Sequence, residues 1–279
     1  NQPLIMLDIT QKTIGDVFSS AVAIWPDAVL FISPKTISSK KVELTYANAQ
    51  KRIKFYQAGF QDAGYGHGER IALLLGNRVE HYLIKLAANN LGISVVPLNP
   101  DLSASELIYI LKDSNSILII TDKNRSHLLS SIKTQLETPL SFVYIEDFSK
   151  SLAPKEKAIN KINVTHKSES SLLYTSGTTG QPKGCILSHE YELMCGDSYR
   201  SIGKPVALEI NKERIFNPLP SFHINAGVLT FFACILTGNC MIQPDRFSSK
   251  TWWGDIEETQ ATIFHYLGVV IAVLLKNKV

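Results

Sequence analysis

Apolar residues in the first 150 positions follow two alternating spacings. Some recur every three or four residues behind an N-cap residue, as from Ile14 to Trp25 behind Thr13, and predict amphipathic helices. Others form continuous runs, such as RIALLL at 70–75, and predict buried strands. The predicted helices cover residues 14–25, 46–62, 79–91, 105–112 and 125–135, and the predicted strands cover residues 28–33, 70–75, 94–98, 117–122 and 142–147. Apolar strands separated by helices indicate an α/β fold with a mostly parallel sheet covered on both faces.

Residues 150–168 interrupt this pattern, because they are rich in lysine and poor in apolar side chains. We expect a linker here, and with it a boundary between subdomains. Residues 170–175 then predict a strand, and 184–188 predict a short strand followed by a helix that Ser188 caps. The two most apolar segments, 227–236 and 266–275, are about half as long as a membrane span and are interpreted as core elements. No transmembrane segment is expected.

Composition and charge give no indication of nucleic-acid binding, secretion or a metal cluster. A net charge of +3 over 279 residues gives no reason to expect nucleic-acid binding, which needs clustered Lys and Arg. The four cysteines form no CxxC pair, and the first residues form no secretory signal, so we expect reduced thiols and a cytoplasmic location. No HExxH or paired CxxC predicts a metal cluster. Trp252 and Trp253 are predicted to anchor a helix to the core, and His265 is predicted to be structural.

The segment YTSGTTGQPKG, residues 174–184, is the most unusual stretch of the chain. It holds three glycines, three threonines, a serine and a lysine directly after a predicted strand. Successive backbone N–H groups in such a turn bind anions, the hydroxyls add donors, and Lys183 adds a mobile positive charge. It is not a Walker A loop, because Pro182 precedes the lysine and Gly184 follows it. The segment therefore predicts a phosphate-binding loop.

The same loop resembles the signature loop of the adenylate-forming superfamily. LTYANAQ to LLLGN, residues 44–77, and NPLPSFHINAG, residues 217–227, resemble two further segments of that family, so the resemblance covers essentially the whole chain. It implies a multilayer αβαβα large domain with mostly parallel sheets. Because family members are about twice as long, it also implies that residues 1–279 are the N-terminal part of the large AMP-binding domain, truncated before its end and before the small C-terminal domain. We expect this fragment alone to be inactive.

The resemblance implies ATP-dependent activation of a carboxylic acid. Family members use ATP and Mg2+ to form an acyl-adenylate with release of pyrophosphate, and a nucleophile, often coenzyme A, then displaces AMP. By resemblance, the residues that cradle the β- and γ-phosphates are Thr175, Ser176, Gly177, Thr178, Thr179 and Gly180. Thr175 would lie near the magnesium ion, and Lys183 would counter the charge of the leaving pyrophosphate. Lys183 is thus both a phosphate-binding and a catalytic candidate.

The segment FHIN, residues 222–225, narrows the substrate class. Amino-acid-activating relatives have an aspartate where this chain has His223, which offers no fixed charge to an ammonium group. The segment is similar to that of fatty-acid and carnitine/crotonobetaine CoA ligases, where the histidine lies near the acyl-adenylate. The resemblance therefore implies a fatty or carnitine-like acid, coenzyme A as co-substrate and His223 as a catalytic candidate. Some fatty-acid relatives have an aromatic residue where Gly227 stands, so we expect a different acyl tunnel here.

Two other functions remain open at this point. The chain could belong to an adenylation domain that loads a carrier protein, or it could be a truncated, non-catalytic nucleotide-binding module. The sequence also leaves a homodimer open.

Overall fold

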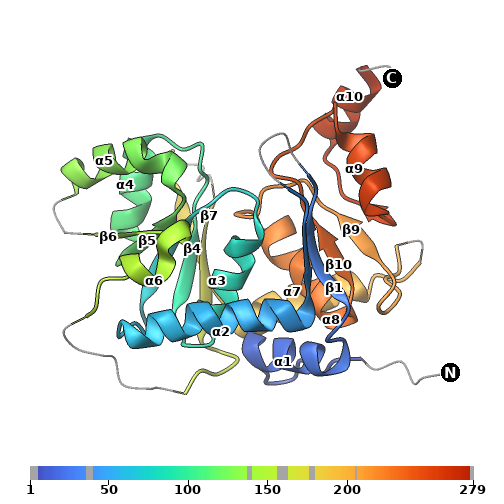
Figure 1. Cartoon of the computed structure of the whole chain (residues 1–279), viewed down its shortest axis with the longest axis horizontal. Helices are drawn as coiled ribbons and strands as arrows, with labels where there is room; N and C mark the ends of the chain where they lie inside the picture. The colour runs from blue at the N-terminus through green and yellow to red at the C-terminus, as the bar shows by residue number, and fades with distance from the viewer. Residues whose placement is uncertain are drawn as a thin grey trace.

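The computed structural model describes residues 6–35, 40–136, 140–155, 163–175, 180–204 and 206–276. Within these residues the strands form two sheets (Figure 1). The first has six strands in the order β6 (Ser141–Tyr144), β5 (Leu118–Thr121), β3 (Arg70–Leu74), β4 (Ser94–Pro97), β7 (Glu169–Thr175) and β8 (Lys183–Ser188). The second has five strands in the order β11 (Ile263–Phe264), β9 (Arg214–Phe216), β10 (Cys240–Ile242), β1 (Val29–Ser33) and β2 (Val42–Thr45).

Both sheets are mostly parallel. The described antiparallel pairs are β7 with β8 and β1 with β2, each at the edge of its sheet. The strands predicted from continuous apolar runs are all confirmed, although β6 ends at Tyr144 and a 3-10 turn follows it. The pattern did not reveal β2, β9 and β10, because β9 and β10 have only three residues each and β2, with two exposed residues, forms no continuous apolar run.

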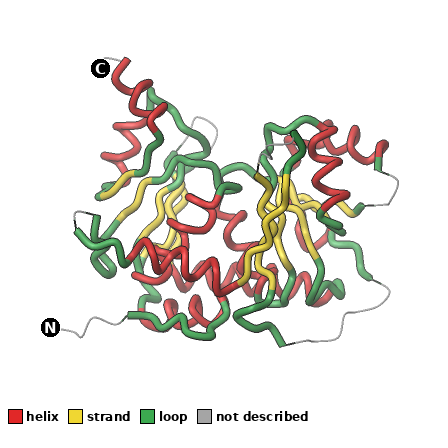
Figure 2. Tube along the Cα trace, turned by 180° about the vertical axis from the view of Figure 1, so that it is seen from behind, coloured by secondary structure: helices red, strands yellow, loops and turns green. Residues whose placement is uncertain are grey.

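Helices form three layers around and between the sheets (Figures 1 and 2). The middle layer contains α1 (Ile14–Ile24), α2 (Tyr46–Asp62), α3 (Val79–Asn89), α7 (His189–Arg200) and α8 (Phe231–Thr237). The outer helices are α4 (Ala104–Asp113) and α5 (Ser126–Gln135) on the six-stranded sheet, and α9 (Trp252–Thr259) and α10 (Gly268–Lys276) on the five-stranded sheet. The short α6 (Phe148–Ser151) packs against α2 and β6. The predicted αβαβα architecture is confirmed.

Alternate residues of each strand supply the two cores beside it. In β3, Ile71 and Leu73 pack in the middle layer, whereas Ala72 and Leu74 pack under α4 and α5. In β1, Phe31 faces the middle layer and Ile32 faces the outer cluster around Trp252. Because successive strand residues point to opposite faces, a fully apolar strand is the signature of a sheet covered on both sides.

The helix starts agree with the capping residues. Thr13 and Asp16 form a capping box, in which Thr13 Oγ1 accepts a hydrogen bond from the Asp16 N–H at 3.1 Å. The Ser188 hydroxyl accepts from the Tyr191 N–H at 3.1 Å, which places the start of α7 at the predicted position.

Two predictions about the C-terminal third are wrong. Residues 266–275 were expected in the core, but in α10 Val269 and Leu275 are 66% and 75% exposed and only Val270 is buried. The side chains of α10 are apolar on every side of the helix, but within the described residues only one side packs against the five-stranded sheet. Trp252 is buried as expected, whereas Trp253 is 52% exposed. The other apolar segment, 227–236, is in the core as predicted. No described helix has both the length and the hydropathy needed to cross a bilayer.

Candidate functional site

The predicted phosphate-binding loop connects two antiparallel strands. Thr175 ends β7, Lys183 begins β8, and the two residues are direct partners in the ladder. Both side chains are exposed. The structure therefore brings Thr175 and Lys183 together at the mouth of the loop. Ser176, Gly177, Thr178 and Thr179 lie outside the described residues.

Gly180 has the backbone conformation that its role in a tight polar turn requires. Its φ is +90°, a value that residues with a side chain rarely adopt. A Cβ added there would meet no atom within 4 Å, so open space surrounds this position. The space and the exposed Thr175 hydroxyl fit a polyphosphate and its magnesium ion. Elsewhere, no group of three or more His, Cys, Asp or Glu in the described residues could hold a metal ion.

Helix α4 holds both sides of this hairpin. The Tyr174 hydroxyl donates to Asp113 Oδ2 at 2.5 Å, and the Tyr109 hydroxyl donates to the Pro182 carbonyl at 3.4 Å. Burial, and then the Asp113 carboxylate, raise the pKa of Tyr174, so its hydroxyl keeps the proton that this bond needs. A Cβ on Gly184 would lie 2.9 Å from Leu172 Cδ1, so glycine permits the close approach of β8 to β7.

A buried ion pair supports the hairpin from the middle layer. Lys85 of α3 donates to Ser171 of β7 and to Glu192 of α7, with the closest Lys85–Glu192 contact at 2.8 Å. The two charged side chains are 2% and 0% exposed, and Ser170 also donates to Glu192 at 2.9 Å. Burial lowers the pKa of Lys85, while the neighbouring carboxylate opposes that shift. The sequence analysis missed this pair, although a lysine inside an apolar helical stretch was a signal.

The second predicted segment follows β9 at the carboxyl edge of the five-stranded sheet. His223 lies in its turn, where the side chain is exposed and its own backbone N–H donates to the Pro220 carbonyl at 3.1 Å. Partial burial lowers the pKa of His223, so the imidazole is neutral at pH 7. The segment continues into a π-helix, Asn225–Thr230, a rare element that is frequent at functional sites.

Gly227 lies in this π-helix and faces the preceding turn. A Cβ added there would lie 2.1 Å from the Ser221 carbonyl oxygen, far inside contact distance. No side chain fits at this position without movement of the turn. Some relatives are expected to have an aromatic residue at this position. In those proteins the turn that corresponds to Ser221 must follow a different path.

His265 was predicted to be structural, and it links three elements at the same edge. Its Nε2 lies 2.8 Å from the Tyr199 hydroxyl of α7, and its Nδ1 lies 3.2 Å from Asn225 Oδ1. Asn225 Oδ1 also accepts from Asn217 Nδ2 at 2.9 Å. Since Oδ1 only accepts, His265 Nδ1 carries the proton and Nε2 accepts from Tyr199. Ligands bind at the carboxyl ends of parallel strands, and these polar groups lie at that edge.

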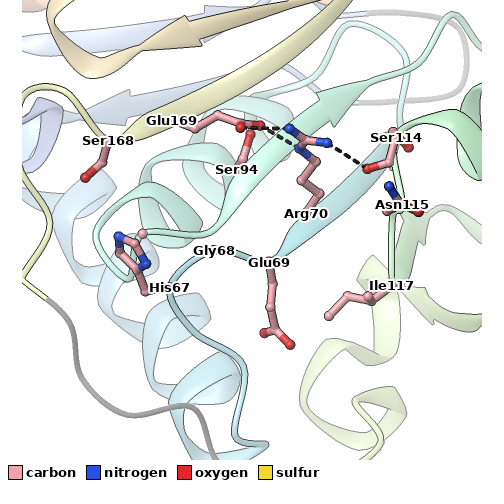
Figure 3. Close-up of a pocket in the computed structure, with 11 residues that line it drawn as sticks. His67, Gly68, Glu69, Arg70, Ser94, Ser114, Asn115, Ile117, Ser168 and Glu169 are labelled. Carbon is pink, nitrogen blue, oxygen red and sulfur yellow. Dashed lines mark hydrogen bonds and ion pairs between the residues drawn. The ribbon is translucent and has the colours of Figure 1, made fainter.

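A separate cavity lies at the opposite edge of the six-stranded sheet (Figure 3). It has a volume of about 480 Å³ and lies at the amino ends of β3, β4, β5 and β7. Arg70 crosses its wall, with Nε 2.7 Å from Glu169 Oε1 and Nη1 3.2 Å from the Ser114 carbonyl. The phosphate loop is at the other end of β7, roughly 20 Å away for a seven-residue strand. The cavity and the predicted site are therefore distinct.

The chain matches one family over most of its length. The model of the AMP-binding enzyme family matches residues 18–279. The long-chain-fatty-acid–CoA ligase FadD13 of Mycobacterium tuberculosis is 27% identical over 251 residues, which cover 88% of this chain and 48% of that protein. The crotonobetaine/carnitine–CoA ligase of Salmonella paratyphi A is 24% identical over 84% of this chain and 47% of that protein.

A solved structure shares the fold. The inhibitor-bound N-terminal domain of FACL13 from Mycobacterium tuberculosis aligns with a TM-score of 0.81 and 26% identity, over 94% of this chain and 65% of that one. The chain spans about half the length of the curated relatives it matches.

Proposed function

Because this chain belongs to the family of AMP-binding enzymes, we propose that it is the N-terminal portion of an ATP-dependent acyl-CoA ligase. The protein would join a carboxylic acid to AMP with release of pyrophosphate, and then transfer the acyl group to the thiol of coenzyme A. The observation that carries this proposal is the hairpin in which Thr175 and Lys183 face each other across the mouth of the phosphate-binding segment.

The hairpin supplies the groups that a departing pyrophosphate needs. Lys183 would neutralise the charge that develops on pyrophosphate, and Thr175 would contribute a hydroxyl ligand to the magnesium ion that accompanies ATP. That ion offsets phosphate charge when it is bound. Residues 176–180 would cradle the β- and γ-phosphates with backbone N–H groups. Donors fixed in advance toward developing charge are worth about 10²–10³-fold each in rate.

His223 supports the proposed substrate class. A neutral imidazole at this position has no negative charge with which to bind the ammonium group of an amino acid. We place His223 at the wall of the acyl site, near the acyl-adenylate. Relatives named as ligases for long-chain fatty acids and for crotonobetaine or carnitine support a fatty or carnitine-like substrate. All four cysteines are free, which supports a cytoplasmic location.

Carboxylate-dependent exchange between ATP and pyrophosphate tests the proposal. The assay should use the longest protein that the gene encodes and a panel of fatty, aryl, carnitine-type and amino acids. Exchange with a fatty or carnitine-type acid, followed by formation of its CoA thioester, is the expected result. Exchange without thioester formation would point to a carrier-protein acceptor. ATP binding without exchange for any acid would overturn the proposal in favour of a non-catalytic module.

The 279 residues alone are proposed to have negligible ligase turnover, because the matched relatives are about twice as long. Formation of acyl-adenylate by this chain at the rate of an intact relative would contradict that proposal.

The side chain of Lys183 offers a direct test of the hairpin. The substitution Lys183→Ala should lower the exchange rate by about 10²-fold. Unfolding free energy should change by less than about 0.5 kcal/mol, because the side chain is exposed. Lys250→Ala, at an exposed turn beside the five-stranded sheet, is the matched control and should retain full exchange. Equal rates for the two variants would remove Lys183 from the mechanism.

A further inference from the structure

The side chain of Asn77 connects the two sheets at their carboxyl edges. Asn77 follows β3 of the six-stranded sheet and is 8% exposed. Its Nδ2 donates to the carbonyls of Leu219 at 3.2 Å and Pro244 at 3.1 Å, and lies 3.4 Å from the Pro218 carbonyl. Its Oδ1 accepts from the Ser221 N–H at 2.8 Å. One amide thus binds backbone groups that follow both β9 and β10 of the five-stranded sheet.

The loop from Asn217 to Ser221 depends on such external partners. Pro218 and Pro220 have no N–H, so the loop has few donors with which to satisfy its own carbonyls. Leu219 is buried, and its carbonyl receives the Asn77 amide and also Gln243 Nε2 at 3.0 Å. Buried carbonyls almost always have a partner, so removal of these amides would leave the loop without its fixed path.

The same loop sets the position of His223. The Ser221 N–H is held by Asn77, and the Ser221 carbonyl packs against Gly227, where no Cβ fits. Two residues later, the His223 carbonyl accepts from the Gly227 N–H at 2.9 Å. The backbone that carries His223 is therefore fixed on one side by Asn77 and on the other side by the π-helix.

The phosphate-binding hairpin belongs to the sheet from which Asn77 extends. Only β4 separates β3 from β7 in the order of the strands. We propose that Asn77 is a positioning residue: it sets the distance between the His223 turn of one sheet and the phosphate-binding hairpin of the other. This inference rests on the proposed ligase function.

The kinetic test compares Asn77→Ala and Asn77→Asp with Asn239→Ala in the longest protein that the gene encodes. Asn239 is 1% exposed and also binds only backbone groups through its side chain, namely Lys212 N–H, Glu213 N–H and the Glu209 carbonyl. It precedes β10, at the amino edge of the five-stranded sheet. It therefore matches Asn77 in burial and bonding but lies away from His223.

In ATP–pyrophosphate exchange, Asn77→Ala should lower kcat by about 10- to 100-fold, because displacement of a group by about 1 Å costs up to that much. The KM for ATP should change less than about threefold, since the phosphate hairpin is not altered. Asn239→Ala should change kcat less than about threefold. Asn77→Asp keeps the acceptor for Ser221 but turns an acceptor-only oxygen toward the Leu219 and Pro244 carbonyls, so its kcat should be no higher than that of Asn77→Ala.

Amide hydrogen exchange gives a readout that does not depend on activity. In Asn77→Ala, protection should fall in residues 219–227 and stay unchanged in β8, and Asn239→Ala should show neither effect. If wild type shows no ATP–pyrophosphate exchange with any acid, the proposed function fails, yet amide hydrogen exchange still decides whether Asn77 holds the turn. If wild type is active and Asn77→Ala loses no more kcat than Asn239→Ala, the inference is overturned. Circular dichroism selects a temperature at which each variant is folded. If Asn77→Ala is unfolded at every temperature, Asn77→Asp, whose side chain has the native shape, replaces it in both measurements.

Discussion

At the residue scale, the site candidates that the sequence offers lie in short motifs, and the groups that act across the fold were missed. Thr175 and Lys183 lie in one contiguous segment and pair across its polar, glycine-rich turn, while their role in phosphate binding stays a prediction. Asn77 binds backbone groups that are 141 to 167 positions further along the chain. No local spacing encodes such contacts, since they arise only when the two sheets are in place.

The close approach at Gly227 leads to a prediction about stability. Gly227→Ala should lower the free energy of unfolding by about 1–3 kcal/mol, because its Cβ would overlap the Ser221 carbonyl oxygen. Gly254→Ala in α9 is the control, since its Cβ would meet no atom within 4 Å. That variant should be neutral or more stable by up to about 1 kcal/mol, from helix propensity. Urea unfolding measures both, and equal midpoints would show that the turn yields freely.

At the element scale, periodicity predicted helices and strands well but did not distinguish their faces everywhere. Both tryptophans at the start of α9 were expected to anchor it, yet consecutive helix residues point about 100° apart, so they cannot both face one core. The rings of Phe216 and Phe247 pack against Trp252, at 5.2 and 5.7 Å between centroids. The prediction that α10 is buried was wrong for a related reason. An apolar helix indicates that other residues cover it, but its sequence does not identify those residues.

The tryptophan pair provides its own control. Trp252→Ala should cost about 3–5 kcal/mol of unfolding free energy, the usual loss for a large buried aromatic side chain. Trp253→Ala should cost less than about 1 kcal/mol, because this side chain is half exposed. Denaturant unfolding followed by circular dichroism avoids the change in tryptophan fluorescence. Similar losses for both variants would contradict the difference in burial.

At the scale of the whole molecule, the sequence pattern predicted the class of fold, and the resemblance predicted its five layers. The pattern alone could not assign β1 to a second sheet, because its parallel neighbour is β10 and that pairing is remote in sequence. Between the sheets, the middle layer contains buried polar groups as well as apolar ones. His81 and His189 lie there, each with one ring nitrogen that has no partner among the described residues.

These two histidines should make the fold sensitive to acid. Burial, followed by the charge of Lys85, lowers the pKa of His81 to about 3 and that of His189 to about 4. Asp16 opposes the shift at His189. Both rings are thus neutral when folded, whereas the unfolded chain protonates them near pH 6.5. Stability should be fully present above pH 6.5 and decrease as the pH falls toward 4, by about 2 kcal/mol per histidine at pH 5.

Urea unfolding at pH 7 and pH 5 measures this loss. In wild type, His189 Nδ1 accepts a hydrogen bond from the Ile14 N–H at 3.1 Å. The variant His189→Asn keeps an acceptor for this N–H but has no group that is protonated near pH 6. Its free energy of unfolding should fall less between the two pH values than that of wild type. An identical fall in both proteins would mean that carboxylates, and not this histidine, cause the acid sensitivity.

The position of β1 also determines when each sheet can close during synthesis. The six described strands of the first sheet have all been translated once residue 188 has left the ribosome, but Phe31 pairs with Met241, roughly 210 residues further along. At about 5–20 residues per second, the N-terminal hairpin waits on the order of 10–40 s for this partner. During that interval the strand edge of β1 and the apolar Leu30, Phe31 and Ile32 have no native partner strand on that side. Of the described strands, β1 is thus translated early and covered late, so its apolar residues are open to nascent-chain chaperones during that interval.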